Sequence, residues 1–126
     1  MDRLRVEFRV VRFVVIREQG PGWDRSRPMR EQDYWPDHVD FVNRIVDEGR
    51  MLLGGPLSEA DGEGKFVDPT EPVGADGTYR ALVVLQADDE RELAELLDGD
   101  PWSEHRVLET HAIYRWEMLV GEIVPG

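Results

Sequence analysis

The stretch "WPDHVDFVNRIVDEGRMLLGG", residues 35–55, decides the fold of this chain. Residues 35–49 have the spacing of an amphipathic helix with one apolar stripe. The stripe consists of Val39, Val42, Ile45 and Val46. Pro36 suits the first helical position, where its missing N–H does no harm, and Gly49 suits the C-terminal cap. Residues 50–55, "RMLLGG", then predict a short strand, so that helix and strand form part of a β-α-β unit.

A strand and a loop are predicted before this helix. Residues 3–16, "RLRVEFRVVRFVVI", alternate between apolar and charged side chains until the pattern slips at Val10-Val11. The slip predicts a bulge or a break there, and "FVVI", residues 13–16, predicts a buried continuation of the strand. Residues 17–32 contain two Gly and two Pro and therefore predict a loop.

The second half of the chain begins with a long segment of turn-forming residues. Residues 57–78 are rich in Gly, Pro, Asp and Glu, and "GKFVD", residues 64–68, allows a short hairpin arm inside them. Asp88 is a suitable N-cap for the helix that follows. The remaining predicted elements are a strand at 78–87, a helix at 89–98 and a strand at 107–119. One face of the last strand is predicted to be apolar, with Leu108, Ala112, Tyr114, Trp116 and Met118, and the other polar, with Glu109, His111, Arg115 and Glu117.

The predicted order is β-α-β-β-α-β, which is typical of the ferredoxin-like, α+β fold. We expect residues 1–126 to form a single domain with one antiparallel four-stranded sheet and two helices on one of its faces. The other face combines polar and apolar side chains, among them Arg80, Gln86, His111, Arg115, Leu82, Val84 and Ile113. A mixed face of this kind favours packing against a second copy, so we expect a homodimer.

Composition excludes several classes of protein. The net charge of −12 argues against a nucleic-acid partner, and a chain without cysteine has no thiol chemistry and suits a reducing compartment. The opening "MDRLRVEFRV" lacks the apolar core of a signal peptide, and no apolar run reaches the ~18 residues of a membrane span. We therefore expect a cytoplasmic protein with neither nucleic acid nor membrane as a partner.

Motifs for metals and common cofactors are absent from the sequence. His105 and His111 would lie about 20 Å apart on a strand, too far for one metal ion. No Gly-rich phosphate loop joins a strand to a helix, and no G-x-S-x-G nucleophile turn is present. We expect no cofactor and no metal.

His38 and Asp100 are the residues with the clearest chemical potential. His38 lies in the first turn of the helix at 35–49, on the same face as Val42 and Ile45, and so points toward the sheet or a groove beside it. A carboxylate partner would fix its tautomer, and Asp100 is the candidate. The alternatives are a core histidine for His38, a turn residue for Asp100 and ordinary edge packing for Trp102, which could otherwise shield the pair from water.

These motifs together resemble the YCII-related family, small proteins with a dimeric α/β-barrel built on the ferredoxin-like fold. Its members typically have a His early in helix one, a G-P-L after strand two and a D-P-F before strand four. The matching positions here are His38, Gly55-Pro56-Leu57 and Asp100-Pro101-Trp102, within a resemblance from about Phe13 to Trp116.

The resemblance implies that His38 and Asp100 form a catalytic pair, with Trp35, Gly55, Pro56 and Trp102 near a small-molecule substrate. The chain departs from the family at Trp35, where an Arg is frequent, and at 104–106, where a Gly is frequent. An aromatic side chain at 35 would favour a less anionic or more apolar ligand.

Three functions remain open on the sequence. The first is an enzyme that transfers protons without a cofactor, an isomerase or a lyase of the dehydrochlorinase type. The second is a small-molecule-binding module without chemistry, and the third is a structural dimer in which His38 and Asp100 only pack. The sequence leaves the substrate open, as well as whether the loops at 18–31 and 57–78 close over it.

Overall fold

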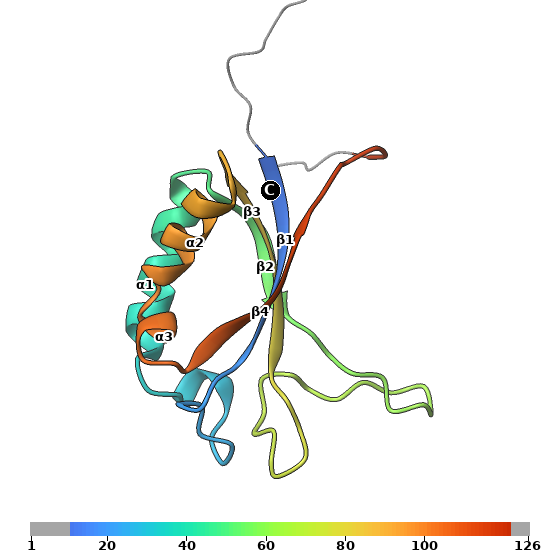
Figure 1. Ribbon diagram of the computed structural model, residues 1–126. Helices are drawn as coiled ribbons and strands as arrows, with labels where there is room; N and C mark the ends of the chain where they lie inside the picture. The colour runs from blue at the N-terminus through green and yellow to red at the C-terminus, as the bar shows by residue number, and fades with distance from the viewer. Residues whose placement is uncertain (1–10, 122–126) are drawn as a thin grey trace, which may run out of the picture.

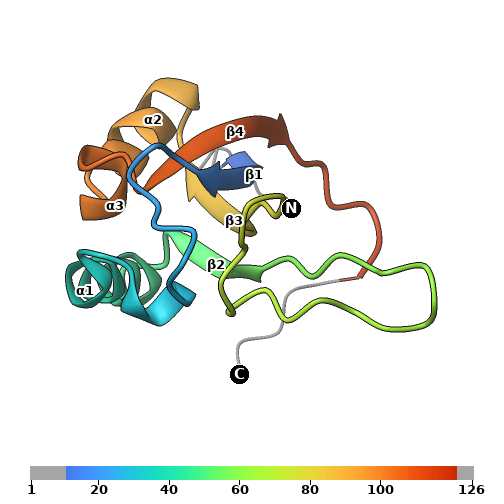
Figure 2. The ribbon, with the colours of Figure 1, turned by 90° about the horizontal axis from the view of Figure 1, so that it is seen from below.

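The computed structural model describes residues 11–121 (Figure 1). Its elements are β1 (Val11–Gln19), the 3-10 turn η1 (Met29–Glu31), α1 (Trp35–Asp47), β2 (Met51–Pro56), β3 (Arg80–Ala87), α2 (Glu90–Asp98), α3 (Pro101–Glu104) and β4 (Leu108–Arg115). The strands form one sheet in the order β2-β3-β1-β4, and every neighbouring pair is antiparallel. The helices all cover the same face of this sheet (Figures 1 and 2). The predicted ferredoxin-like, α+β fold is therefore confirmed.

Strand β1 extends further than its sequence pattern indicates. The predicted loop began at Arg17, but β1 continues to Gln19, whose backbone N–H donates to Tyr79 O at 3.0 Å. Arg17 continues the helix-facing row of this strand and is buried in spite of its charge. The register with β4 shifts between Ile16 and Arg17. Residues 3–10, including Val10 of the predicted slip, lie outside the described residues.

Helix α1 has the predicted position but a different buried face. Phe41 and Ile45 are buried, whereas Val46, predicted to belong to the stripe, is 46% exposed. The stripe that meets the sheet runs through positions four apart, so Phe41 replaces Val46. Gly49 has φ 77° and its amide donates to Val46 O, which confirms the predicted glycine cap.

Helix α2 is capped one residue later than predicted. The side chain of Asp89, not Asp88, accepts from Glu92 N at 2.8 Å. The Glu92 carboxylate in turn accepts from Asp88 N at 3.1 Å. This reciprocal arrangement satisfies the helix amide of Glu92 and the amide of Asp88 just before the cap, and Asp88 contributes only its backbone to it.

The faces of β4 differ from the prediction because of the register shift. Leu108, predicted on the apolar face toward the helices, does pack toward them. Tyr114, predicted on that same apolar face, instead lies opposite Val14 on the open face of the sheet. Ile113 and Arg115, predicted on the open face, pair with Val15 and Phe13 and so belong to the helix side. The predicted alternation of faces along β4 fails at His111, because the pairing with β1 passes from Ala112 to Thr110 and skips this residue.

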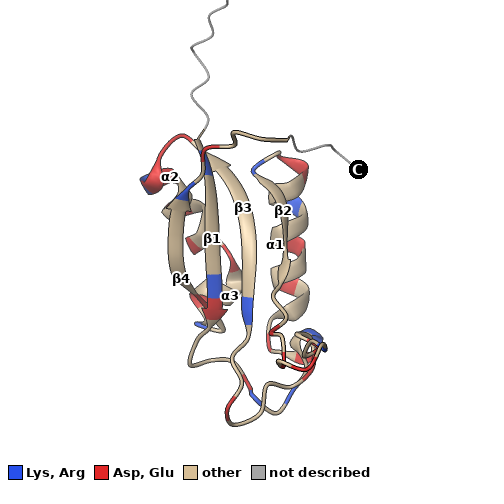
Figure 3. Ribbon diagram, turned by 90° about the vertical axis from the view of Figure 1, so that its right-hand side faces the viewer, with Lys and Arg blue, Asp and Glu red and all other residues tan. Residues whose placement is uncertain are grey.

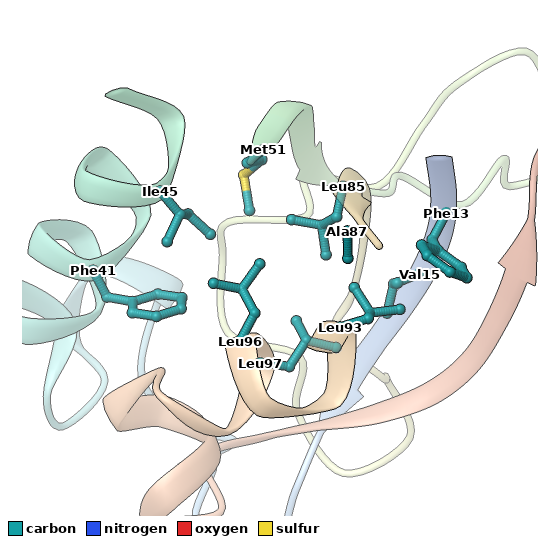
Figure 4. Packing of buried hydrophobic residues seen from close by; sticks show 10 residues of the cluster. All are labelled: Phe13, Val15, Phe41, Ile45, Met51, Leu85, Ala87, Leu93, Leu96 and Leu97. Carbon is teal, nitrogen blue, oxygen red and sulfur yellow. The ribbon is translucent and has the colours of Figure 1, made fainter. Parts of the chain in front are cut away.

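The interior contains two groups of buried side chains. The first, called the apolar cluster here, consists of Phe13, Val15, Phe41, Ile45, Met51, Leu85, Ala87, Leu93, Leu96 and Leu97 (Figure 4). The second, called the aromatic cluster, consists of Trp23, Met29, Tyr79, Ala81, Trp102, Val107 and Leu108. Both lie between the sheet and the elements that cover it.

The segment between β2 and β3 projects away from the sheet (Figure 2). It contains one antiparallel bridge, Ala60 to Phe66, at the predicted hairpin arm. The face of the sheet opposite the helices shows charged residues toward the ends of the strands and none across their middle (Figure 3). None of the helices in the described part of the chain is long and apolar enough to cross a membrane.

Candidate functional site

The structure brings His38 and Asp100 together. Nδ1 of His38 lies 2.9 Å from Oδ1 and 3.0 Å from Oδ2 of Asp100. The side chains are 15% and 4% exposed, so the pair is largely removed from water. An ionised carboxylate only accepts, so Nδ1 carries the proton and donates it to this bond. That tautomer leaves the lone pair on Nε2, which makes this atom the basic one.

Local backbone geometry fixes the Asp100 carboxylate. Asp100 is the N-cap of α3, and its Oδ1 accepts from Trp102 N at 2.9 Å. The sequence left two alternatives for Asp100, a turn residue or a partner of His38. The structure shows both, because Asp100 caps α3 and also contacts His38. A capped carboxylate has few alternative rotamers, so the imidazole meets a fixed acceptor.

Trp102 supports the imidazole from behind. Its ring stacks on that of His38 with centroids 3.9 Å apart and an angle of 11° between the planes. Its Nε1 donates to Asp33 O at 2.8 Å, and the residue is 1% exposed. Trp102 does not border the cavity described below and contacts the ring of His38. The ring of His38 is thus held by a hydrogen bond at one edge and a stacked indole on one face.

A cavity of about 180 Å³ lies between α1 and the sheet, beside this pair. Five of the six site residues expected from the sequence line it, all except Trp102: Trp35, His38, Gly55, Pro56 and Asp100. Most other lining residues are apolar, including Phe41, Ile45 and Met51. For scale, a cavity of roughly 150 Å³ lined by apolar side chains holds benzene. The size therefore suits a molecule with a single ring.

Two polar residues that the sequence did not single out also line the cavity, Arg17 and Tyr79. Arg17 is 3% exposed, and its burial lowers the pKa of the guanidinium, an effect opposed by the charges of Asp100 and Asp98. Burial raises the pKa of Tyr79 to about 12, so its hydroxyl stays protonated at neutral pH. The alternation Phe13, Val15, Arg17 was the available signal, because it places Arg17 on the helix-facing row of β1.

Side chains suited to a metal do not gather in this part of the chain. Within residues 11–121, no three His, Cys, Asp or Glu side chains lie close enough together to hold an ion. His105 stacks on Tyr34, and Nδ1 of His111, on β4, lies 3.6 Å from Oε2 of Glu18, on β1. The site is therefore one imidazole–carboxylate pair beside an apolar cavity that contains two further donors.

Comparisons with known proteins agree with this fold. Residues 11–117 match the YCII-related domain, and the chain belongs to that family. A similar solved structure is the 5-chloro-2-hydroxyhydroquinone dehydrochlorinase (TftG) from Burkholderia phenoliruptrix AC1100, in complex with 2,5-dihydroxybenzoquinone. It has a TM-score of 0.58 and 19% sequence identity, over 84% of this chain and 93% of that one. At this identity the likeness establishes a shared fold. No curated protein matches the sequence.

Proposed function

We propose that this protein is a cytoplasmic enzyme that moves a proton on a small one-ring organic molecule, with His38 as the base and Asp100 as the residue that orients it. The observation that carries the proposal is the bond of Nδ1 to both oxygens of Asp100, at 2.9 and 3.0 Å, in a histidine that also lines the cavity. A base held in one tautomer beside an apolar pocket is the arrangement that general base catalysis requires.

The chemistry that suits such a site is isomerisation or elimination. In either reaction Nε2 of His38 takes a proton from carbon, and the C–H electron pair moves into the ligand. In an isomerisation the imidazolium returns the proton to another carbon. In an elimination the electron pair forms a double bond and expels a leaving group such as chloride. The dehydrochlorinase that shares the fold is an example of the second type, and its name supports this reaction class for the present chain.

The experiment that tests the proposal is a turnover screen with matched histidine variants. The compounds are lactones, small unsaturated acids and chlorinated hydroxyaromatics of one ring. His38→Ala should lower turnover about 10²–10⁴-fold, as loss of a general base typically does. It should cost on the order of 1–2 kcal/mol of unfolding free energy, since the ring lies at the edge of the core.

His111→Ala is the matched control for this screen. His111 also lies near a carboxylate, with Nδ1 3.6 Å from Glu18 Oε2, but its side chain is half exposed on β4. Turnover in this variant should equal that of the unchanged protein. Equal turnover in His38→Ala, measured per folded molecule, would rule out His38 as the base.

A binding module without chemistry is the second candidate, supported by the apolar lining of the cavity. It predicts that the same compounds bind and leave unchanged. It also predicts that His38→Ala alters affinity but that no compound is converted by either protein. The two candidates are therefore separated by product formation, not by binding.

We also propose that two copies pair through the open face of the sheet. Support comes from the uncharged middle of that face and from Tyr114 and Leu53, which are 59% and 48% exposed there (Figure 3). Sedimentation at micromolar concentration should give twice the 14.5 kDa of the chain. A species of 14.5 kDa alone would contradict the dimer.

A further inference from the structure

Arg17 and Tyr79 face the cavity together from the sheet. Arg17 lies opposite Ala81 in the β1–β3 pairing, and Tyr79 precedes Ala81 by two residues on the same side. Diagonal neighbours of this kind have side chains close enough for both to reach one ligand atom. His38 reaches the same cavity from α1, so a molecule between the helix and the sheet would have the base on one side and these two donors on the other.

The hydrogen bonds of Arg17 leave donors unused. Nη2 donates to Ser103 Oγ at 2.6 Å and, more weakly, to Leu108 O at 3.4 Å. Nε is buried without a partner, and no carboxylate in residues 11–121 forms an ion pair with the guanidinium. A buried charge with unpaired donors is costly unless something accepts from it. An oxygen with negative charge in the cavity would be such an acceptor.

Tyr79 offers a second donor that is held only weakly. Its hydroxyl contacts the sulfur of Met29 at 3.2 Å, and a thioether is a weak acceptor. A ligand oxygen would replace that sulfur at little cost. Because Tyr79 keeps its proton at neutral pH, it donates rather than repels a developing anion.

We propose that Arg17 and Tyr79 bind the carbonyl oxygen of the substrate and hold the oxyanion formed when His38 removes a proton from the adjacent carbon. This inference rests on the proposed function and names the substrate class: one-ring carbonyl compounds with an acidic C–H beside the carbonyl. The C–H pair becomes the C=C bond of an enolate, the C=O π pair moves to oxygen, and the proton goes to Nε2 of His38. Return of the proton at another carbon, or departure of a leaving group with its electron pair, completes the reaction.

The test uses two probes of one ring that differ in a single oxygen. 4-Nitrophenol at mildly alkaline pH is an anion that mimics the enolate oxygen, and nitrobenzene lacks that oxygen. Equilibrium dialysis of the full chain measures both affinities. The unchanged protein should bind the phenolate at least about tenfold more tightly, which is the scale of a hydrogen bond to a charged group.

The variants are Arg17→Met and Tyr79→Phe, with Tyr114→Phe as control. Arg17→Met should abolish the preference for the phenolate, and Tyr79→Phe should reduce it severalfold. Tyr114 is on the opposite face of the sheet, so Tyr114→Phe should leave the preference intact. Tyr79→Phe removes only a hydroxyl that is hydrogen-bonded to the sulfur of Met29, so this variant should fold. It therefore still tests the inference if Arg17→Met does not fold. Equal affinity for both probes, no binding of the phenolate, or an unchanged preference in Tyr79→Phe and in folded Arg17→Met would overturn the inference.

His38→Ala separates this inference from the proposed function. The variant should lose turnover but keep the preference for the phenolate, because the donors remain. If it keeps turnover while the Arg17 and Tyr79 variants lose the preference, the oxyanion site stands and the base is another group. If it loses turnover while those variants keep the preference, the base stands and the oxyanion site is wrong.

Discussion

The layer between the sheet and the helices has two ends with different side-chain chemistry, although the same two elements, β1 and α1, run through both. Along β1 the helix-facing side chains are Phe13, Val15 and Arg17. Along α1, which runs the opposite way, the corresponding side chains are Ile45, Phe41 and His38. Both rows pass from hydrocarbon to ionisable groups toward the same end, so one end is the apolar cluster and the other is the candidate site.

This difference indicates where stability and chemistry reside. The apolar cluster buries ten hydrophobic residues and contributes through removal of apolar surface from water (Figure 4). The other end buries Arg17 and Asp100, which are 3% exposed each, and leaves a cavity beside them. Buried charges and unfilled space both cost stability, and such costs concentrate at sites of function. Substitutions at the two ends should therefore affect different measurements.

Asp100→Asn should have the largest effect, and it should appear in turnover. Asparagine can still cap α3, so we expect a change of only about 1 kcal/mol in unfolding free energy. Its amide presents the wrong group to Nδ1 and favours the wrong tautomer of His38, which should lower kcat about 10²–10⁴-fold. Steady-state kinetics and urea unfolding on the same preparation check both numbers. Glu18→Gln, next to the exposed His111, should change neither, and an unchanged kcat in Asp100→Asn would remove the pair from the mechanism.

Leu93→Ala should show the opposite pattern at the other end. Leu93 is fully buried in the apolar cluster and does not line the cavity. Its truncation should lower the unfolding free energy by about 3 kcal/mol, within the 2–5 kcal/mol typical of Leu→Ala in cores. Turnover per folded molecule should not change. Val46→Ala, at an exposed position of α1, should stay within about 0.5 kcal/mol of the unchanged protein.

Tyr79→Phe should change how the unfolding free energy depends on pH. This effect should be smaller than that of Leu93→Ala. The pKa of Tyr79 is raised to about 12 in the folded protein, above its ordinary value near 10 in an unfolded chain. Below pH 10 both states keep the proton; above it the unfolded state loses the proton first, so stability falls as the pH rises toward 12. Phenylalanine has no hydroxyl to ionise, so the variant does not lose stability in this way.

The difference in unfolding free energy between the two proteins should therefore shift in favour of Tyr79→Phe by about 1 kcal/mol between roughly pH 9 and pH 11. Urea titrations of both proteins at the two pH values measure it. A constant difference would show that the Tyr79 hydroxyl ionises as freely in the folded protein as in the unfolded one.

The sequence predicted the elements whose signals are local. Helix α1 and its Gly49 cap, strand β3 and the order of the fold follow from periodicity and turn residues. It failed where tertiary contacts decide. The register shift beside Arg17 reverses part of β4, and α3 is too short for a periodic signal.

The candidate site was partly within reach of sequence reasoning. His38 and Asp100 are 62 residues apart, and no local pattern joins them. The sequence named Asp100 as a candidate partner, and the family resemblance then supported the pairing. Arg17 fell within the loop that the Gly and Pro residues of 17–32 predicted, so its burial on β1 was missed. Tyr79 was predicted to lie in the strand at 78–87, and nothing in the sequence distinguished it from the other residues of that strand. Their shared position on the cavity depends on strand pairing, which the sequence does not state.

The most direct test of the central claim is proton–deuterium exchange on a one-ring carbonyl compound. 2-Cyclohexen-1-one in D₂O, followed by proton NMR, reports removal of a proton from carbon without any need to know the natural substrate. The unchanged protein and His111→Ala should accelerate exchange beside the carbonyl at least about 10²-fold over buffer, and His38→Ala should return it to the buffer rate. Exchange no faster than in buffer with the unchanged protein, or equally fast in His38→Ala, would contradict the account.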